Sequence, residues 1–264
     1  MSKGARKEAL KTEKVKIQVK NLIKRFGDLL VLDKVSFSVY ENEFLCICGP
    51  TGCGKTTLLN IIAGLIPATD SAPILIDGEP INPQRHNISF VFQEPSCLPW
   101  RNVRDNIKFG LEIKKEVLKQ NMTENEIEEK VSRIINLVGL DEFEEYYPHQ
   151  ISGGMKQRVA IAQAFVTDPD LLLMDEPFGY LDVQTRYYME KEVLRIWRKL
   201  KRTVIFVTHN IEEAVYLAER VIVLTELPAH VKAVIPIDLP RPREYTDPEF
   251  VKIRRHITSL VKWW

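Results

Sequence analysis

The chain has 264 residues, and 45% of them are hydrophobic, which is enough for a buried core and argues against a disordered protein. Lys and Arg number 37 against 36 Asp and Glu, so there is no overall basic field and we expect no nucleic-acid partner. Four cysteines do not make a disulfide scaffold and fit reduced thiols in a cytoplasmic protein, and no apolar run approaches the roughly 20 residues of a membrane helix.

The first part of the chain predicts a basic tail followed by strands. Residues 1–14 are basic but have no apolar stretch behind the charges, so we expect a solvated tail, with a membrane-surface contact as the alternative. The alternation from Val15 to Val19 and the later "VLDKVSFSVY" predict an antiparallel pair of strands. The continuous apolar run from Phe44 to Cys48 predicts a buried strand.

A helix, a hairpin and a block of helices are expected next. Residues 56–66 have helical spacing, and Asp77-Gly78 between short apolar runs predicts a hairpin within Ile74 to Ile81. From about 95 to 169 the chain becomes charged and helical, which indicates a helical insertion. Within it, Thr123 and Glu126 predict a capping box, and Gly139 would end that helix. The apolar faces expected of the two helices are Leu58, Leu59, Ile62 and Leu65 in the first, and Ile127, Val131, Ile134, Ile135 and Val138 in the second.

The rest of the chain returns to alternating strands and helices, which indicates an α/β fold. "LLLMDEP" and "TVIFVTH" predict buried strands, Glu190 to Leu200 predicts a helix, and "NIEEAVYLAER" predicts a helix capped by Asn210 and followed by the strand "VIVL". We expect a main domain over residues 15–226 and an extension over 227–264. The extension ends in an amphipathic helix that begins near Asp247 and packs on the protein's own core through Phe250, Ile253, Ile257 and Leu260.

A glycine-rich stretch between an expected strand and an expected helix matches the phosphate-loop pattern G-x-x-x-x-G-K-[ST]. Glycines let backbone N–H groups point at phosphate oxygens, and the helix adds its positive N-terminal end. Lys55 can reach the β- and γ-phosphates and the Thr56 hydroxyl can ligate Mg²⁺, whereas the alternative is a glycine turn with a surface lysine. The expected nucleotide-binding residues here are Gly49, Pro50, Thr51, Gly52, Cys53, Gly54, Lys55, Thr56 and Thr57.

Asp175 and Glu176 end the strand "LLLMDEP", where an acidic pair is costly unless it serves a charge. Asp175 can hold Mg²⁺ through a water molecule, and Glu176 is placed to orient and deprotonate an attacking water. A strand-ending turn before Pro177 is the alternative. His209 and Gln93 also follow apolar strands, and each alone is more often an ordinary polar residue at a strand end.

The segment "ISGGMKQRVAIAQA" supplies a second candidate anion site. Ser152, Gly153 and Gly154 open a helix, so their turn presents glycines and a helix N-terminus, as the phosphate loop does. A nucleotide has one phosphate tail, so a single chain would offer two phosphate sites where one nucleotide needs one. Two copies arranged head to tail resolve this, because each phosphate loop then faces the Ser-Gly-Gly turn of the other copy.

With these motifs in place, the sequence resembles the ATP-binding subunits of ABC transporters over roughly Val15 to Leu224. The resemblance implies an ATP hydrolase with a P-loop NTPase core, an antiparallel β subdomain and an inserted α-helical subdomain. The motifs that carry it are, in order, Phe26, the Walker A loop from Gly49 to Thr56, the glutamine loop at Gln93, the signature from Ser152 to Met155, Walker B from Leu171 to Asp175 with Glu176, the D-loop from Gly179 to Asp182, and the switch residue His209.

The resemblance also implies the cofactors, ATP and Mg²⁺, and a role for each motif. ATP is expected to lie between two copies, with the catalytic residues Glu176, His209, Gln93 and Lys55, and with Thr56, Gln93 and Asp175 at the metal. The remaining implied roles are adenine stacking for Phe26, contact with the γ-phosphate on the opposite copy for Ser152, Gly153 and Gly154, and a bridge between the two sites for Asp182.

The segment from Gln93 to Trp100 is expected to contact integral membrane permease subunits, which places the chain at the cytoplasmic face of the membrane. Leu98-Pro99-Trp100 resembles the nitrate, sulfonate and taurine importer branch, whose importers also use an extracytoplasmic substrate-binding protein. The alternatives are a solvent loop packed on the core, another solute, an exporter, or a soluble ABC ATPase that acts on nucleic acid or ribosomes. Trp263 and Trp264 offer a further membrane-surface or partner contact.

Three of the four cysteines lie in or beside the phosphate loop, at a spacing that suggests a metal or redox site. The simpler interpretation is that Cys46 and Cys48, two apart on a buried strand, are small apolar fillers. Cys53 lies between two loop glycines, where Lys55 would favour the thiolate, so we expect it to be sensitive to alkylation.

Overall fold

The computed structural model describes residues 14–69, 74–82, 85–116, 119 and 121–261. Two compact units divide the chain: the first unit is Met1–His86 with Arg202–Trp264, and the second unit is Asn87–Lys201. The predicted tail up to residue 13, together with Trp263 and Trp264, lies outside the described residues. Within the described ranges, no helix is both long enough and apolar enough to cross a bilayer.

The first unit contains the predicted antiparallel sheet. Its two long strands pair in antiparallel register, and a short hairpin adds to the β1 edge. Asp77 and Gly78 both have positive φ, 52° and 82°, which two-residue hairpin turns of this kind require. In spatial order, the strands are β2 (Leu29–Tyr40), β1 (Val15–Phe26), β4 (Leu75–Ile76) and β5 (Glu79–Pro80).

Four further strands of the first unit form a mostly parallel array. In order they are β10 (Val231–Pro236), β9 (Arg220–Leu224), β3 (Phe44–Cys48) and β8 (Thr203–Val207). Every residue of β3 and of β8 is buried, which explains their continuous apolar sequences. The sequence did not predict β10, because this antiparallel edge strand alternates half-buried with exposed residues and ends at a proline.

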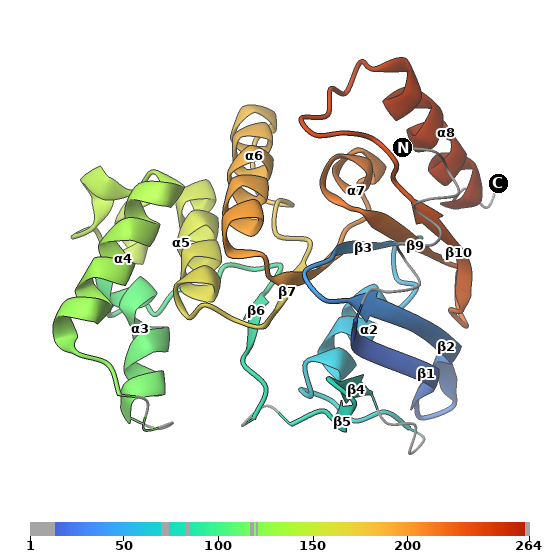
Figure 1. The fold of residues 1–264 in the computed structure, drawn as a ribbon, viewed down its shortest axis with the longest axis horizontal. Helices are drawn as coiled ribbons and strands as arrows, with labels where there is room; N and C mark the ends of the chain where they lie inside the picture. Colours follow the sequence, from blue (N-terminus) through green and yellow to red (C-terminus); the bar gives the residue numbers. More distant parts are fainter. Residues whose placement is uncertain (1–13, 70–73, 83–84, 117–118, 120, 262–264) are drawn as a thin grey trace. The chain divides into compact units, whose positions relative to one another are not determined.

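Among the described residues, the helices of the first unit are α2 (Lys55–Ile62), α7 (Ile211–Leu217) and α8 (Pro248–Val261), and α8 packs against α7 and β9 (Figure 1). The expected helix over 56–66 is too long at its C-terminal end, where Leu65 is 56% exposed. Gly64, at φ 72°, lets its N–H donate to the Ile61 carbonyl at 3.0 Å and the Leu65 N–H to the Asn60 carbonyl at 2.9 Å, which ends the helix.

The described residues of the second unit form a two-strand parallel pair and four helices. The expected capping box of α4 is confirmed: the Thr123 hydroxyl accepts from the Glu126 N–H at 3.3 Å, and the Thr123 N–H donates to the Glu126 carboxylate at 2.8 Å. Figure 1 shows α3, α4 and α5 as neighbours, and α3 and α4 both pack on α5. The elements are β6 (Ile88–Val91), α3 (Val103–Glu116), α4 (Glu124–Val138), the 3-10 turns Asp141–Phe143 and Pro148–Gln150, α5 (Gly153–Val166), β7 (Leu171–Asp175) and α6 (Val183–Leu200).

The helix expected from Glu190 begins seven residues earlier, since α6 starts at Val183 and Glu190 lies inside it. Asp182 sets this start, because its carboxylate accepts from the N–H groups of Gln184 at 3.1 Å and Thr185 at 3.0 Å. The D-loop residue Asp182 is therefore also the N-cap of a long helix.

Candidate functional site

The phosphate loop connects β3 to α2 in the first unit. Lys55 is 5% exposed, and its Nζ donates to the carbonyl oxygens of Gly49 at 3.1 Å and Pro50 at 2.9 Å. No side chain caps the N-terminus of α2, so the N–H groups of its first turn carry no side-chain acceptor there. Thr56, in that first turn, is exposed. Buried ammonium and open backbone amides together suit a polyphosphate.

Two of the loop glycines have backbones that a larger residue would strain. Gly52 has φ 77° and Gly54 has φ 102°, both in the left-handed region that favours glycine. A Cβ built on Gly54 would also lie 2.7 Å from the Val31 side chain. The loop is therefore closely packed against β2 on its inner side, which helps to hold its backbone in one curve.

His209 leaves the same sheet edge as the phosphate loop. β3 and β8 are parallel neighbours with Ile47 opposite Val207, so both strands end toward one side, and the Thr208 N–H donates to the Ile47 carbonyl at 3.2 Å. His209 is exposed, and Asn210 caps α7 as expected, accepting from the N–H groups of Glu212 at 2.9 Å and Glu213 at 3.5 Å. The first unit thus brings together two predicted site elements that lie far apart in sequence.

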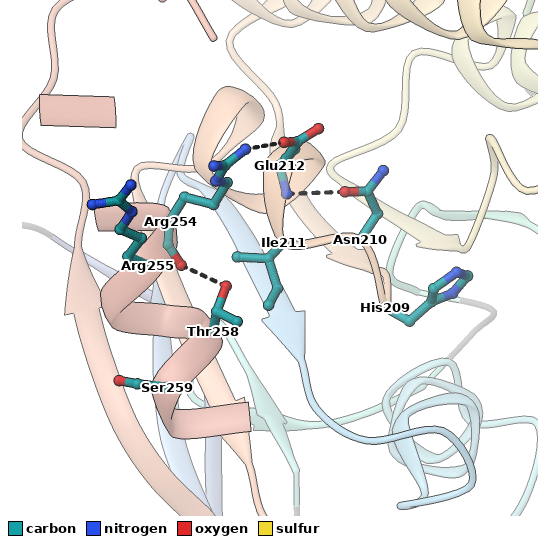
Figure 2. Close-up of a pocket in the computed structure, with 8 residues that line it drawn as sticks. All are labelled: His209, Asn210, Ile211, Glu212, Arg254, Arg255, Thr258 and Ser259. Carbon is teal, nitrogen blue, oxygen red and sulfur yellow. Dashed lines mark hydrogen bonds and ion pairs between the residues drawn. The ribbon is translucent and has the colours of Figure 1, made fainter. Parts of the chain in front are cut away.

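An open cavity of about 540 Å³ lies between the His209 loop and α8, with Arg254 and Arg255 on its α8 side. Arg254 pairs with Glu212 across it (Figure 2). Figure 2 shows the His209 ring turned away from these two arginines.

Phe26, at the end of β1, is 51% exposed, and the Lys24 ammonium lies 4.7 Å from its ring centroid. A cation over an aromatic face is an attractive contact. The side chain is accessible to a flat ligand, and its predicted stacking on adenine stays a prediction.

In the second unit, the acidic pair lies where β7 ends. Asp175 is 3% exposed, whereas Glu176 is partly exposed and has a left-handed φ of 44°. Such a backbone is uncommon for a residue with a side chain and is found preferentially at functional sites. The turn continues through Gly179, whose N–H donates to the Glu176 carbonyl at 3.1 Å, and reaches Asp182. The Thr185 hydroxyl and the N–H groups of Thr185 and Gln184 lower the pKa of the exposed Asp182 carboxyl below its ordinary value.

The Ser-Gly-Gly turn opens α5 on the surface of the second unit. Ser152 is the N-cap, with its hydroxyl accepting from the Met155 N–H at 3.2 Å, and both Ser152 and Gly153 are exposed. A Cβ added at Gly153 would meet nothing within 4 Å. The turn is therefore open to a ligand from outside the chain.

The segment after Gln93 presents an exposed aromatic residue. Gln93 is exposed, and Trp100 is 71% exposed, so the tryptophan does not pack on the core as the alternative interpretation required. Sequence reasoning missed the residue that shapes this segment, the fully buried Asn106 of α3. Its side chain accepts from the Leu98 N–H at 2.7 Å and donates to the carbonyls of Leu98 at 3.1 Å and Arg101 at 2.8 Å. An asparagine on the buried face of a helix was the available signal, because such a group needs partners.

The structure contradicts the accessible thiolate on which the expected alkylation of Cys53 depends. Its side chain is 1% exposed, and burial raises the pKa of its thiol above the ordinary value, although Lys55 acts in the opposite direction. Cys46 and Cys48 are buried on β3 as expected, and burial raises the pKa of Cys48 to about 12. Within the described ranges, no three or more His, Cys, Asp or Glu residues gather as a metal cluster.

The predicted residues divide between the two units. The first unit holds the phosphate loop, Phe26 and His209, and the second holds Gln93, the Ser-Gly-Gly turn, Asp175, Glu176 and Asp182. Each half therefore presents groups suited to a phosphate chain, its metal or an attacking water.

Comparisons with known proteins agree with this reading. A family model described as ABC transporter matches residues 32–179. An uncharacterized ABC transporter ATP-binding protein of Methanocaldococcus jannaschii is 47% identical over 94% of this chain and 92% of its own length. The aliphatic sulfonates import ATP-binding protein SsuB of Bacillus cereus is 42% identical over 91% of this chain and 92% of its own length.

Among solved structures, a dimeric ATP-binding cassette in a post-hydrolysis state with bound ADP and Pi superposes with a TM-score of 0.74 at 28% identity. The match covers 85% of this chain and all of that one. The chain therefore belongs to the ABC transporter family. Membership confirms the expected α/β cassette fold and the expected ABC-type ATP hydrolase.

Proposed function

We propose that this chain energises an importer for a small solute of the nitrate, sulfonate or taurine class. The observation that carries the proposal is its 42% identity to an aliphatic sulfonates import ATP-binding protein across 91% of the chain. The exposed Trp100 after Gln93 supports it, since a transport ATPase needs a surface for its membrane partner. The chain would work at the cytoplasmic face of the membrane and depend indirectly on an extracytoplasmic substrate-binding protein.

The proposed chemistry begins with the phosphate chain of ATP. The backbone N–H groups of the phosphate loop would surround the β- and γ-phosphates, and the buried Lys55 ammonium would exchange its two carbonyl partners for phosphate oxygens. Phe26 would stack on the adenine. Glu176, as general base, would take a proton from the water that attacks the γ-phosphorus, while His209 would hold the γ-phosphate and orient Glu176.

The donor set also suits Mg²⁺. The Thr56 hydroxyl, the Asp175 carboxylate and the Gln93 amide offer oxygen ligands, which this hard cation prefers, and the burial of Asp175 would favour a cation beside it. When bound, the ion would neutralise charge on the transferred phosphoryl group.

A second copy would complete the site. Ser152, Gly153 and Gly154 of one copy would contact the γ-phosphate held by the phosphate loop of the other, and Asp182 would bridge the two sites. The support is the exposure of this turn in the chain and the dimeric state of the similar cassette with ADP and Pi. ATP would draw the copies together, and hydrolysis would release them.

The experiment that tests the importer is solute uptake by cells that lack this chain. We expect uptake of labelled taurine, nitrate or an alkanesulfonate to require the wild-type chain and to fail with Glu176→Gln. Uptake of all three without the chain would reject the solute class. An ATPase that never co-purifies with a membrane protein would instead favour a soluble role.

The proposed permease contact has its own prediction. Trp100→Ala removes the 71% exposed indole, so we expect permease co-purification to weaken by roughly 30-fold or more, as for an aromatic anchor, while ATPase activity of the isolated chain is unchanged. Leu65→Ala, at an apolar residue that is 56% exposed outside this segment, is the matched control and should leave co-purification intact. Equal recovery with both variants would contradict the assigned surface.

A further inference from the structure

We infer that a cavity among α4, α5 and α6 of the second unit binds a small amphiphilic monoanion, such as an aliphatic or aromatic sulfonate or carboxylate of about six carbons. The cavity has a volume of about 130 Å³ and is partly enclosed. The inference goes beyond the proposed function and does not depend on which solute the transporter carries.

The floor of the cavity is apolar and buried. Phe165 and Val166, at the end of α5, are each 2% exposed, Ile196 of α6 is 1% exposed and Ile134 of α4 is 8% exposed. These side chains come from three helices, so the hollow is formed by their packing rather than by one loose loop. An apolar cavity of roughly 150 Å³ is known to stay dry and to accept benzene, so this one suits a ring or chain of about six carbons.

The rim of the cavity is positively charged. Lys130 and Arg133 of α4 and Lys199 of α6 line it, against a single carboxylate from Asp168. No ion pair involving these three side chains is found in the described part of the chain, although Lys130 acts electrostatically on Glu126, one turn earlier in α4. Their positions follow from helical spacing, since Lys130, Arg133 and Ile134 share one face of α4. Three cations around an apolar floor favour a ligand with an apolar body and an anionic head.

The positions of the lining residues would keep the anionic head of the ligand apart from its carbon chain. The cations are exposed, whereas the floor residues are buried, so an anion would stay at the solvent edge while its carbon chain enters the hollow. A purely polar anion such as phosphate would leave the floor unfilled, and a neutral hydrocarbon would leave the cations unused. The combination therefore selects an amphiphile.

The test is calorimetric titration of the purified, nucleotide-free full chain with butane-, hexane- and octanesulfonate, and with neutral hexanol. We expect a dissociation constant on the order of 1 mM for hexanesulfonate. Affinity should rise about fourfold per methylene up to about six carbons and then level off, because the cavity is filled. A steady rise through octanesulfonate would indicate surfactant-like adsorption and would overturn the inference.

Three variants separate the site from nonspecific binding. Arg133→Gln with Lys199→Gln should weaken hexanesulfonate about tenfold, as two exposed ion pairs would, and leave hexanol binding unchanged. Arg198→Gln, at an exposed neighbour that does not line the cavity, is the matched control and should bind as the wild type does. Leu137→Phe, which fills the cavity, should weaken both ligands. Unchanged binding in the double variant or in Leu137→Phe, or no saturable binding in the wild type, would overturn the assignment.

Discussion

Lys55, which we propose contacts the phosphates, has its charge satisfied within the phosphate loop itself. A buried ammonium without partners is costly, and here two carbonyls of the phosphate loop accept its protons. Both carbonyls belong to residues within six positions of Lys55, so the charge is satisfied locally and held at the centre of the loop. In our proposal, phosphate oxygens replace these two acceptors when the nucleotide binds.

A single substitution tests the proposed role of Glu176 as the general base. Glu176→Gln keeps the size of the side chain but removes its ability to accept the proton, so we expect kcat for ATP hydrolysis to fall by at least about 100-fold while ATP binding persists. Turnover is measured by phosphate release and binding by calorimetry. Glu142→Gln, at an exposed glutamate in a 3-10 turn, should behave as the wild type. Near-normal turnover in Glu176→Gln would reassign the base.

Burial also decides the behaviour of Cys53. Since its pKa is raised and its sulfur is inaccessible, little thiolate is present near pH 8 and we expect N-ethylmaleimide to label the native protein far more slowly than a free thiol. A raised pKa means that labelling should speed up as the pH rises. Mass spectrometry of native and urea-unfolded protein measures this, with the unfolded thiols as the control. Rapid native labelling at Cys53 would show that the loop opens in solution.

At the scale of elements, Arg243 ties the C-terminal extension to α7. This arginine is 6% exposed, and its guanidinium donates to the carbonyls of Val215 at 2.6 Å, Tyr216 at 3.0 Å and Ala218 at 2.6 Å. These carbonyls belong to the end of a seven-residue helix, which lacks intrahelical partners for them. A side chain 25 or more positions away thus completes a helix beside the His209 loop.

Arg243→Met should therefore lower the free energy of unfolding by about 3 kcal/mol, because several buried carbonyls lose their donor. Urea unfolding followed by circular dichroism measures the change. Arg255→Met, at an exposed arginine of α8, should cost less than about 0.5 kcal/mol. Equal stability of the two variants would mean that water replaces the guanidinium.

At the scale of the whole molecule, the proposed site residues are shared by two units and, in our proposal, by two copies. One chain carries a phosphate loop in its first unit and a Ser-Gly-Gly turn in its second. Gly153 has open space around its missing Cβ, so a substitution there tests the partner contact without disturbing the chain itself. Aspartate at this position suits the helix N-terminus but would repel a phosphate.

Mixing two inactive variants tests the shared site. Gly153→Asp and Lys55→Ala should each hydrolyse ATP at least about tenfold more slowly than the wild type, and equimolar mixing should restore part of the activity. Recovery is expected because a mixed pair contains one site with an intact phosphate loop and an intact opposite turn. A mixture of Gly153→Asp with Glu176→Gln should recover activity in the same way. A mixture of Lys55→Ala with Glu176→Gln should show no recovery, because both residues would act on the nucleotide held by their own copy and every site in a mixed pair is then altered. Failure of both rescuing mixtures would place the whole site in one chain.

The elements were predictable where a local pattern has one physical solution. Thr123 and Glu126 cap α4 as expected, and Asp77-Gly78 makes the expected hairpin, because both motifs are closed by residues three or fewer positions apart. Predictions failed where a contact with a distant residue, or only a weak sequence pattern, determined the element or its first residue. The edge strand β10 forms only because β9 is available to pair with it, and α6 starts at Asp182 rather than Glu190.

The sequence by itself determined the motifs, their order and hence the family, because the phosphate loop, the signature turn and the acidic pair are short segments whose residue types carry their chemistry locally. Only the tertiary structure determined which side chains are accessible and which distant segments of the chain lie together. It buried the thiol of Cys53, left Trp100 exposed, and carried β8 beside β3 so that His209 leaves the sheet at the edge of the phosphate loop. Burial and strand pairing depend on contacts between residues far apart in the chain, and no local pattern encodes them.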